Sequence, residues 1–264
     1  MEKSYPAWPV AAIRRFLDYV EQNERLLHLS MQGISQLQAL PGIVEAIANF
    51  EQGGPQERGE KNRVSLDLSK TIASFAQNEV TSGFPLLHAH TLIGTWGAFE
   101  AAIEDTLVSF LLNKPELLQQ ESFAKLRIPL ADFELLEREE RMRFLIAELE
   151  RSQGFGRKIG IEKCEALLEP LGLSGPVDRD IKKDVREMNH VRNVLVHRAS
   201  IADRRLIEGC PWLNLKTGEL ISVKHEDLVR YERALCTYVT ALIYRILARL
   251  GVPPDVPSCS PLVP

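Results

Sequence analysis

The chain has few aromatic residues, no paired cysteines and no long uninterrupted apolar run. Aromatic side chains make up only 7% of its 264 residues, and its four cysteines are scattered with no C-x-x-C pair, so reduced thiols are expected. The longest apolar stretch near the C-terminus, ALCTYVTALIYRILARL, is interrupted by Arg245 and Arg249 and is too short to span a bilayer. The N-terminal stretch MEKSYPAWPVAAIRRF carries early charges and lacks an apolar signal-peptide core. These absences predict a soluble cytoplasmic protein.

Excess positive charge and cofactor motifs are also missing. The net charge of −4 argues against a chain that coats nucleic acid through bulk charge, although it leaves room for a local basic patch. No G-x-S-x-G, P-loop or dinucleotide fingerprint occurs in the chain. We therefore expect a mechanism that needs no cofactor.

What the sequence does contain is helical patterning. Leu, Ala, Glu, Gln and Arg dominate, and apolar residues recur at helical spacing, which predicts an all-α helical bundle of four to five main helices. The bundle helices are expected at 86–113, 132–153, 176–197 and 225–250, with a short helix over 161–173. The N-terminal helices are expected at 7–37, 40–52 and 65–80, with a polar loop at 53–63. A small hairpin turning at Thr217-Gly218 is expected before the last helix. The resulting division is an accessory region over 1–80, a bundle over 81–250 and a proline-rich disordered tail over 251–264.

The stretch MNHVRNVLVHRAS, at 188–200, breaks the pattern at one position. Apolar residues recur at alternating steps of three and four through Val185, Met188 and Leu195, but the intervening position of that seam is Arg192. Asn193 follows it directly, and His197 comes five residues later, near the expected end of a helix whose start is marked by Ser174 and Pro176.

A straight helix places Arg192 and His197 roughly 140° apart and roughly 7.5 Å apart along its axis, so they cannot converge on one atom. Two arrangements would bring them together. The helix can break just before His197, or a two-fold mate can present its own pair across the seam. A half-buried arginine that faces a cleft between protomers suits the second arrangement, because an anionic ligand would neutralise it.

RNVLVHRASIADRR, with the long helix carrying AFEAAIEDTLVSFL before it, resembles the HEPN superfamily, helical domains found in many prokaryotic toxins and defence ribonucleases. The family signature of arginine, a polar residue, a few apolar residues and histidine matches Arg192, Asn193 and His197. The resemblance covers roughly 86–250. It implies a homodimeric, metal-independent endoribonuclease with a composite active site, in a toxin–antitoxin or antiviral defence setting with a possible antitoxin or other partner protein. The alternative is a catalytically silent module of the same fold that binds a partner protein or a nucleotide.

The implied chemistry needs few groups because RNA supplies its own nucleophile, the 2′-OH. His197 would act as general base or acid, and Arg192 would grip the phosphate and oppose its developing charge. Asn193 would orient the imidazole or the phosphate. The expected product carries a 2′,3′-cyclic phosphate.

Basic residues around the motif are the candidate substrate-binding residues. Lys182, Lys183, Arg186 and Arg198, with Arg204 and Arg205 nearby, would form a phosphate-binding rim in an otherwise acidic chain. An ordinary charged surface would show the same residues. Trp212 is a candidate base-stacking platform or the packed anchor of the hairpin.

Structural explanations compete with the catalytic one. His197 is favourable near a helix C-terminus through the helix dipole alone, and Arg192 can pair with Glu100 or Glu104 of the preceding long helix. His88 and His90 invite a metal site, but their i, i+2 spacing places them on different helix faces and no H-E-x-x-H pattern occurs. No metal site is therefore expected.

Overall fold

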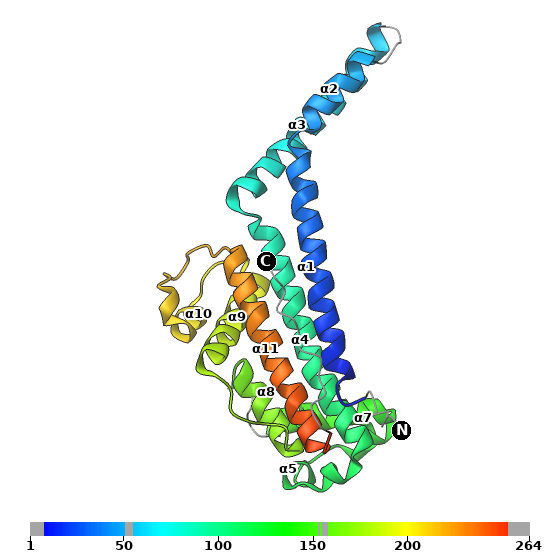
Figure 1. Cartoon of the computed structure of the whole chain (residues 1–264), viewed down its shortest axis with the longest axis vertical. Helices are drawn as coiled ribbons and strands as arrows, with labels where there is room; N and C mark the ends of the chain where they lie inside the picture. The colour runs from blue at the N-terminus through cyan, green and yellow to red at the C-terminus, as the bar shows by residue number, and fades with distance from the viewer. Residues whose placement is uncertain (1–7, 51–54, 153, 155–157, 253–264) are drawn as a thin grey trace.

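The computed structural model describes residues 8–50, 55–152, 154 and 158–252, and these form an all-α protein, as predicted (Figure 1). Over these residues the α-helices are α1 (Ala11–Leu37), α2 (Leu40–Phe50), α3 (Pro55–Ser82), α4 (Pro85–Asn113), α5 (Glu121–Ala124), α6 (Leu130–Leu135), α7 (Arg138–Ser152), α8 (Ile161–Leu168), α9 (Arg179–Arg198), α10 (Arg204–Gly209) and α11 (His225–Arg249). Short 3₁₀ turns are η1 (Pro115–Gln119), η3 (Glu169–Leu171) and η4 (Pro211–Leu213).

Helix α4 is the centre of the bundle. It contacts α1, α7, α9 and α11, and its buried residues face in several directions, as the long apolar stretch predicts. Phe99 is fully buried and packs edge-on against Phe16 of α1 and Tyr238 of α11. The first half of α1 therefore shares one core with the bundle, although the sequence division places a boundary at residue 80.

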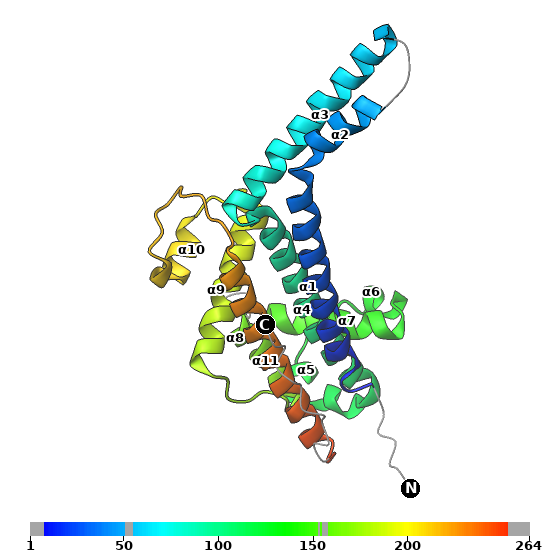
Figure 2. The ribbon, with the colours of Figure 1, turned by 45° about the horizontal axis from the view of Figure 1, so that its top comes forward.

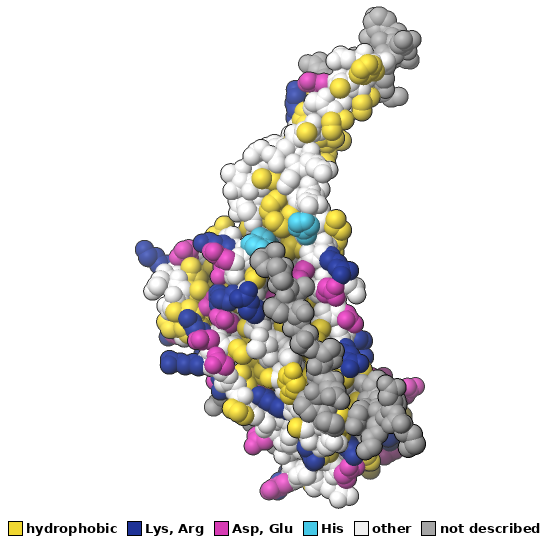
Figure 3. All heavy atoms as spheres, viewed as in Figure 1, with side chains coloured by type: hydrophobic (Ala, Val, Ile, Leu, Met, Phe, Trp, Pro, Cys, Tyr) yellow, Lys and Arg dark blue, Asp and Glu magenta, His cyan; other side chains and the backbone are white. Residues whose placement is uncertain are grey.

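Beyond the bundle, α2 and α3 form a projecting two-helix arm (Figures 1 and 2). Helix α2 buries none of its residues, and Ile43, Ile47 and Phe50 are more than half exposed. Phe75 of α3 is also mostly exposed, and hydrophobic side chains are visible along the arm in Figure 3. Helix α2 therefore has no core beneath it.

Four expected elements are corrected by the structure. The polar loop at 53–63 was wrong, because 55–63 are the first part of α3, which packs against α2. The single helix at 132–153 is two helices, α6 and α7, with extended backbone at Leu136 between them. Glu140 explains the new start, since its carboxylate accepts the Glu137 backbone N–H at 3.1 Å, as in half of a capping box.

The motif helix α9 also starts later than expected. Asp178, rather than Ser174 or Pro176, is its N-cap, and its carboxylate accepts the N–H groups of Asp180 and Ile181. The hairpin before the last helix is absent from the described residues. The turn at 217–218 is present, but the strands are reduced to one bridge between Ile201 and Leu220, and α10 and η4 occupy the rest. Most of the proline-rich tail lies outside the described residues.

A buried carboxylate fixes α9 against α11. Glu187 is only 2% exposed and accepts hydrogen bonds from Trp212 Nε1, from Tyr231 Oη at 2.7 Å and from Arg230 Nη2 at 2.5 Å. Arg230 also pairs with Asp184 and Asp227. Because every polar group in this cluster has a partner, it holds α9 in a defined position relative to α11 and η4.

A second buried carboxylate lies between α4 and α11, and no cation of a described residue pairs with it. Glu232 is 4% exposed and accepts a hydrogen bond from Thr95 Oγ1 at 3.0 Å, and Thr95 in turn accepts one from Asn23 of α1. Burial raises the pKa of Glu232 to about 7. The hydrogen bond from Thr95 opposes this rise, and the nearby Glu24 adds to it.

The raised pKa of Glu232 predicts a loss of stability as pH rises. The folded state holds the proton of Glu232 more tightly than the unfolded state does. The free-energy cost of ionising the buried side chain is therefore absent below pH 4.5, the ordinary pKa, and complete above about pH 7, the pKa in the folded state. Its upper bound is about 3 kcal/mol. We expect Glu232→Gln to raise the melting temperature at pH 8 and leave it nearly unchanged at pH 4.5. The exposed Glu226→Gln is the control, and equal shifts at both pH values would contradict the prediction.

Two further expectations concern thiols and membranes. Cys164 and Cys210 are buried free thiols. Over the part of the chain that the structure describes, no helix combines the length and the apolar character that crossing a bilayer requires.

Candidate functional site: a polar cleft at the end of helix α9

The predicted catalytic residues line a cleft of about 820 Å³ between four helices. Its walls come from α4, α7, α8 and α9, and the start of α10 closes one end. The polar and charged lining residues are Glu100, Glu104, Arg143, Glu150, Lys158, Lys163, Asn189, His190, Arg192, Asn193, His197, Arg198, Asp203 and Arg205. The structure thus brings Arg192, Asn193 and His197 to one hollow.

Helix α9 is continuous through His197 and ends at Arg198, so the arrangement in which the helix breaks before His197 is wrong. Within one chain the two side chains therefore line the same cleft without converging on a common point. The arrangement across a two-fold axis stays a prediction.

Arg192 is held at the cleft by its neighbours. Its side chain is 26% exposed, its Nη1 donates to Asn193 Oδ1 at 3.0 Å, and its Nη2 lies 3.9 Å from a carboxylate oxygen of Glu100. Its Nε is buried and has no acceptor among the described residues. Asn193 also donates to Asn189 Oδ1 at 3.4 Å. The guanidinium is thus positioned by Asn193 and still lacks part of the acceptor set that it can use.

The chain turns sharply just after His197. Ala199 and Ser200 both have left-handed backbone conformations, with φ of 48° and 68°, which non-glycine residues rarely adopt. The Ser200 N–H donates to the Val194 carbonyl at 3.3 Å and closes the helix end. This turn returns the chain so that Asp203 and Arg205 line the cleft beside the exposed His197.

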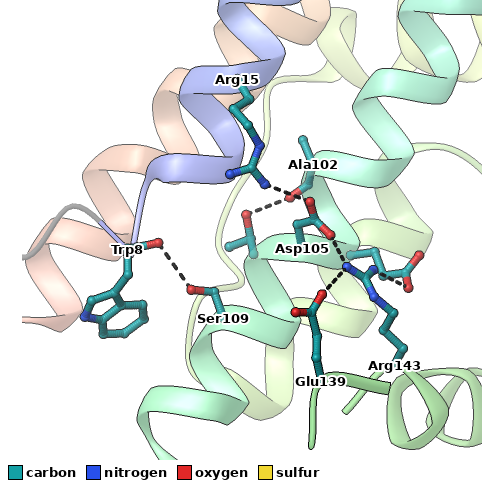
Figure 4. A network of polar contacts seen from close by, with 9 residues as sticks. Trp8, Arg15, Ala102, Asp105, Ser109, Glu139 and Arg143 are labelled. Atoms are coloured by element: carbon teal, nitrogen blue, oxygen red, sulfur yellow. Dashed lines mark hydrogen bonds and ion pairs between the residues drawn. The ribbon is translucent and has the colours of Figure 1, made fainter. Parts of the chain in front are cut away.

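Arg143 forms the opposite wall and is immobilised by three carboxylates. Its guanidinium donates to Asp105 at 2.6 Å, to Glu104 at 2.9 Å and to Glu139 at 2.9 Å, and Asp105 also binds Arg15 of α1 (Figure 4). These ion pairs raise the pKa of Arg143 further above its usual range, the bonds to Asp105 and Glu104 contributing most. Arg143 therefore fixes α7 against α4.

His190 lies beneath the cleft as a buried histidine. It is 8% exposed and its ring packs against the backbone of Gly209, where a Cβ would lie 2.2 Å from Nε2. Burial lowers the pKa of His190, the positive charge of Arg186 lowers it further, and Asp203 opposes both. A neutral, packed His190 supports the position of α10 rather than proton transfer.

The predicted substrate-binding residues divide into two groups. Arg198 lines the cleft and lies 3.8 Å from Asp203. Lys182, Lys183 and Arg186 lie instead in a separate hollow of about 500 Å³ on the N-terminal half of α9. The backbone at Gly160 packs against the Arg186 backbone between the two hollows.

A metal site finds no support in the geometry of the described residues. No group of three or more His, Cys, Asp or Glu side chains among them is arranged to hold a metal ion. His88 is buried, and its Nδ1 lies 3.2 Å from the Val223 carbonyl oxygen, so it serves the packing of α4 against the segment before α11.

Arg143 and Lys158 are cleft residues that the sequence did not reveal. Arg143 sits in the acidic stretch REERMRF, which has the pattern of an ordinary solvated helix face. Glu100 and Glu104 also line the cleft, and Glu100 is the one that faces Arg192. Neither Arg143 nor Lys158 carries a local sequence signal, because each comes close to the motif only through helix packing.

Comparison of the chain with family models, with curated proteins and with solved structures found no match.

Proposed function

We propose that this protein is a metal-independent endoribonuclease of HEPN type. The observation that carries the proposal is the common cleft of Arg192, Asn193 and His197, with Arg198 at its rim. These residues match the family signature, and their side chains are accessible to a ligand that enters from solvent. The toxin–antitoxin or defence setting, and a composite site in a homodimer, belong to the same proposal.

The proposed reaction uses the 2′-OH of RNA as the nucleophile. His197 removes the 2′-OH proton or protonates the leaving 5′-oxygen, and a second proton-transferring group completes the reaction. The second histidine of a two-fold mate would supply that group if the site is composite. The new bond joins the 2′-oxygen to phosphorus, the bond to the 5′-oxygen breaks, and the products carry a 2′,3′-cyclic phosphate and a 5′-hydroxyl.

Arg192 contributes charge and orientation. A guanidinium donates two parallel hydrogen bonds to a phosphate and opposes the charge that develops on its oxygens. Asn193 already accepts from Arg192, and this bond keeps the guanidinium directed along the cleft. Glu100, at 3.9 Å, is a weak partner that an RNA phosphate would displace.

The ion pairs of the cleft favour one other candidate function. Arg143 is bound by three acids, and Arg192 faces Glu100, so part of the positive charge is already neutralised. Such a cleft also suits a non-catalytic module that binds a partner protein or a nucleotide.

One assay separates these functions. Purified protein is incubated with a long RNA in the presence of EDTA, and the ends of the products are analysed. We expect cleavage that gives cyclic phosphate ends, and no cleavage of the same sequence with 2′-deoxyribose or 2′-O-methyl ribose. Absence of cleavage by the folded wild-type protein would contradict the ribonuclease and favour the binding module.

A further inference from the structure

We propose that the hollow on the N-terminal half of α9 is an RNA-backbone site, separate from the cleft, that holds phosphates of the same strand that the cleft cleaves. This inference rests on the proposed function for the identity of its ligand. The hollow is lined by Arg179, Lys182, Lys183 and Arg186 of α9, by Ile159, Ile161 and Glu162, and by Trp212. We call it the basic hollow.

The charges of the basic hollow are not neutralised within the described part of the chain. None of its four cations makes an ion pair with another described residue, whereas Arg143, Lys163, Arg192 and Arg198 around the cleft all do. The Nε of Arg186 is also buried with no acceptor among the described residues. Glu162 is the single acid among the lining residues, and it is exposed. A cluster of this kind attracts an anion from solvent.

Contacts with neighbouring groups also hold the side chains of the basic hollow in place. The Lys183 ammonium lies 5.2 Å from the ring centroid of Trp212, in a cation–π contact. The Trp212 ring is fixed in turn because its Nε1 donates to the buried Glu187. Helix α8 begins here after Gly160, so the positive end of its dipole adds to the field of the side chains.

The geometry of α9 favours a linear polyanion. Arg179 and His197 are separated by 18 residues, or five helical turns, so they lie on the same face about 27 Å apart. Lys182, Arg186 and Asn193 lie on this face between them, and Ile159 lines both the basic hollow and the cleft. Gly160 packs on this face at Arg186, and Gly209 packs on it at His190. A single strand of RNA would therefore pass outside these two glycines, over Ile159, to place its phosphates at the basic hollow and its reacting phosphate at the cleft.

The test is a salt titration of RNA binding to the full chain. The probe is a fluorescent 2′-O-methyl oligouridylate of about 20 nucleotides, which binds without being cleaved. The variant is Arg179→Ala/Lys182→Ala, and both positions are exposed. The matched control is Lys70→Ala/Arg233→Ala, whose positions are also exposed and line neither hollow. Circular dichroism verifies that all the proteins are folded.

Loss of two phosphate contacts should reduce the salt slope, the change in log Kd with log salt, by about 1.4 for a single strand. We expect that change in the double variant, with a Kd about tenfold weaker in 0.1 M salt, and wild-type behaviour in the control. Equal Kd values and slopes for variant and wild type would overturn the proposal. Tighter binding of oligoglutamate than of the probe, at equal charge and equal salt, would also overturn it, in favour of an acidic protein partner.

The two proposals fail in different ways. A protein that binds the probe through Arg179 and Lys182 but leaves long RNA intact supports the basic hollow and contradicts the ribonuclease. A protein that cleaves long RNA equally well with and without these two cations supports the ribonuclease and contradicts the basic hollow.

Discussion

Replacing His197 with alanine is expected to lower the rate of RNA cleavage about 10²- to 10⁴-fold at neutral pH. This is the usual contribution of a positioned acid–base group. Arg192→Ala should lower the rate about 10²- to 10³-fold, as does removal of one donor that stabilises developing charge. Arg192→Lys keeps the positive charge but loses the two-pronged contact with phosphate, and it should fall between Arg192→Ala and the wild type.

These losses are measured as single-turnover rates on one defined RNA in EDTA. The matched control is His28→Ala, because His28 is an exposed histidine of α1 that does not line the cleft. A double variant that lacks Arg192 and His197 should be little slower than the slower single variant, since residues that act as a unit are not additive. A His197→Ala protein that keeps its rate within about threefold would remove His197 from the mechanism.

The second large effect is on stability. Glu187→Ala should lower the free energy of unfolding by about 3–5 kcal/mol, because Trp212 and Tyr231 lose their buried acceptor and Arg230 loses one of its three carboxylates. For a chain of this size the change corresponds to a fall of roughly 10 °C in melting temperature.

Thermal denaturation measures this effect. Glu187→Gln keeps an acceptor and should lose less than half as much stability, while the exposed Glu226→Ala should change little. A shift of under 2 °C for Glu187→Ala would show that the cluster contributes little to holding α9 on α11.

The sequence predicted the bundle because local patterns decide most of it. The apolar periodicity of α4 and α11 is long and strong, and both helices lie within a residue of their expected bounds. The motif residues are also close together in the chain. Arg192, Asn193 and His197 lie on one helix, so they line one cleft once α4, α7 and α8 pack against α9.

The errors have a common physical origin in tertiary contacts. The segment GGPQERGEKNR has the composition of a turn, yet its residues from 55 onward are helical beside α2. The sequence also does not show which residues share a hollow. Lys182 and Arg186, whose role in substrate binding stays a prediction, are near Arg192 in the chain but line a separate hollow. Arg143 is distant in the chain and yet lines the same cleft. Such proximity depends on how helices pack and leaves no local pattern.

Helix α2 of the arm and the bundle are expected to unfold at different free-energy costs. Helix α2 buries none of its side chains, whereas the first half of α1 shares the core of α4 and α11. A helix that buries little apolar surface gains little from tertiary packing, so its opening costs far less free energy than unfolding of the bundle. Helix α2 can therefore unwind and re-form many times while the cleft at the end of α9 stays intact.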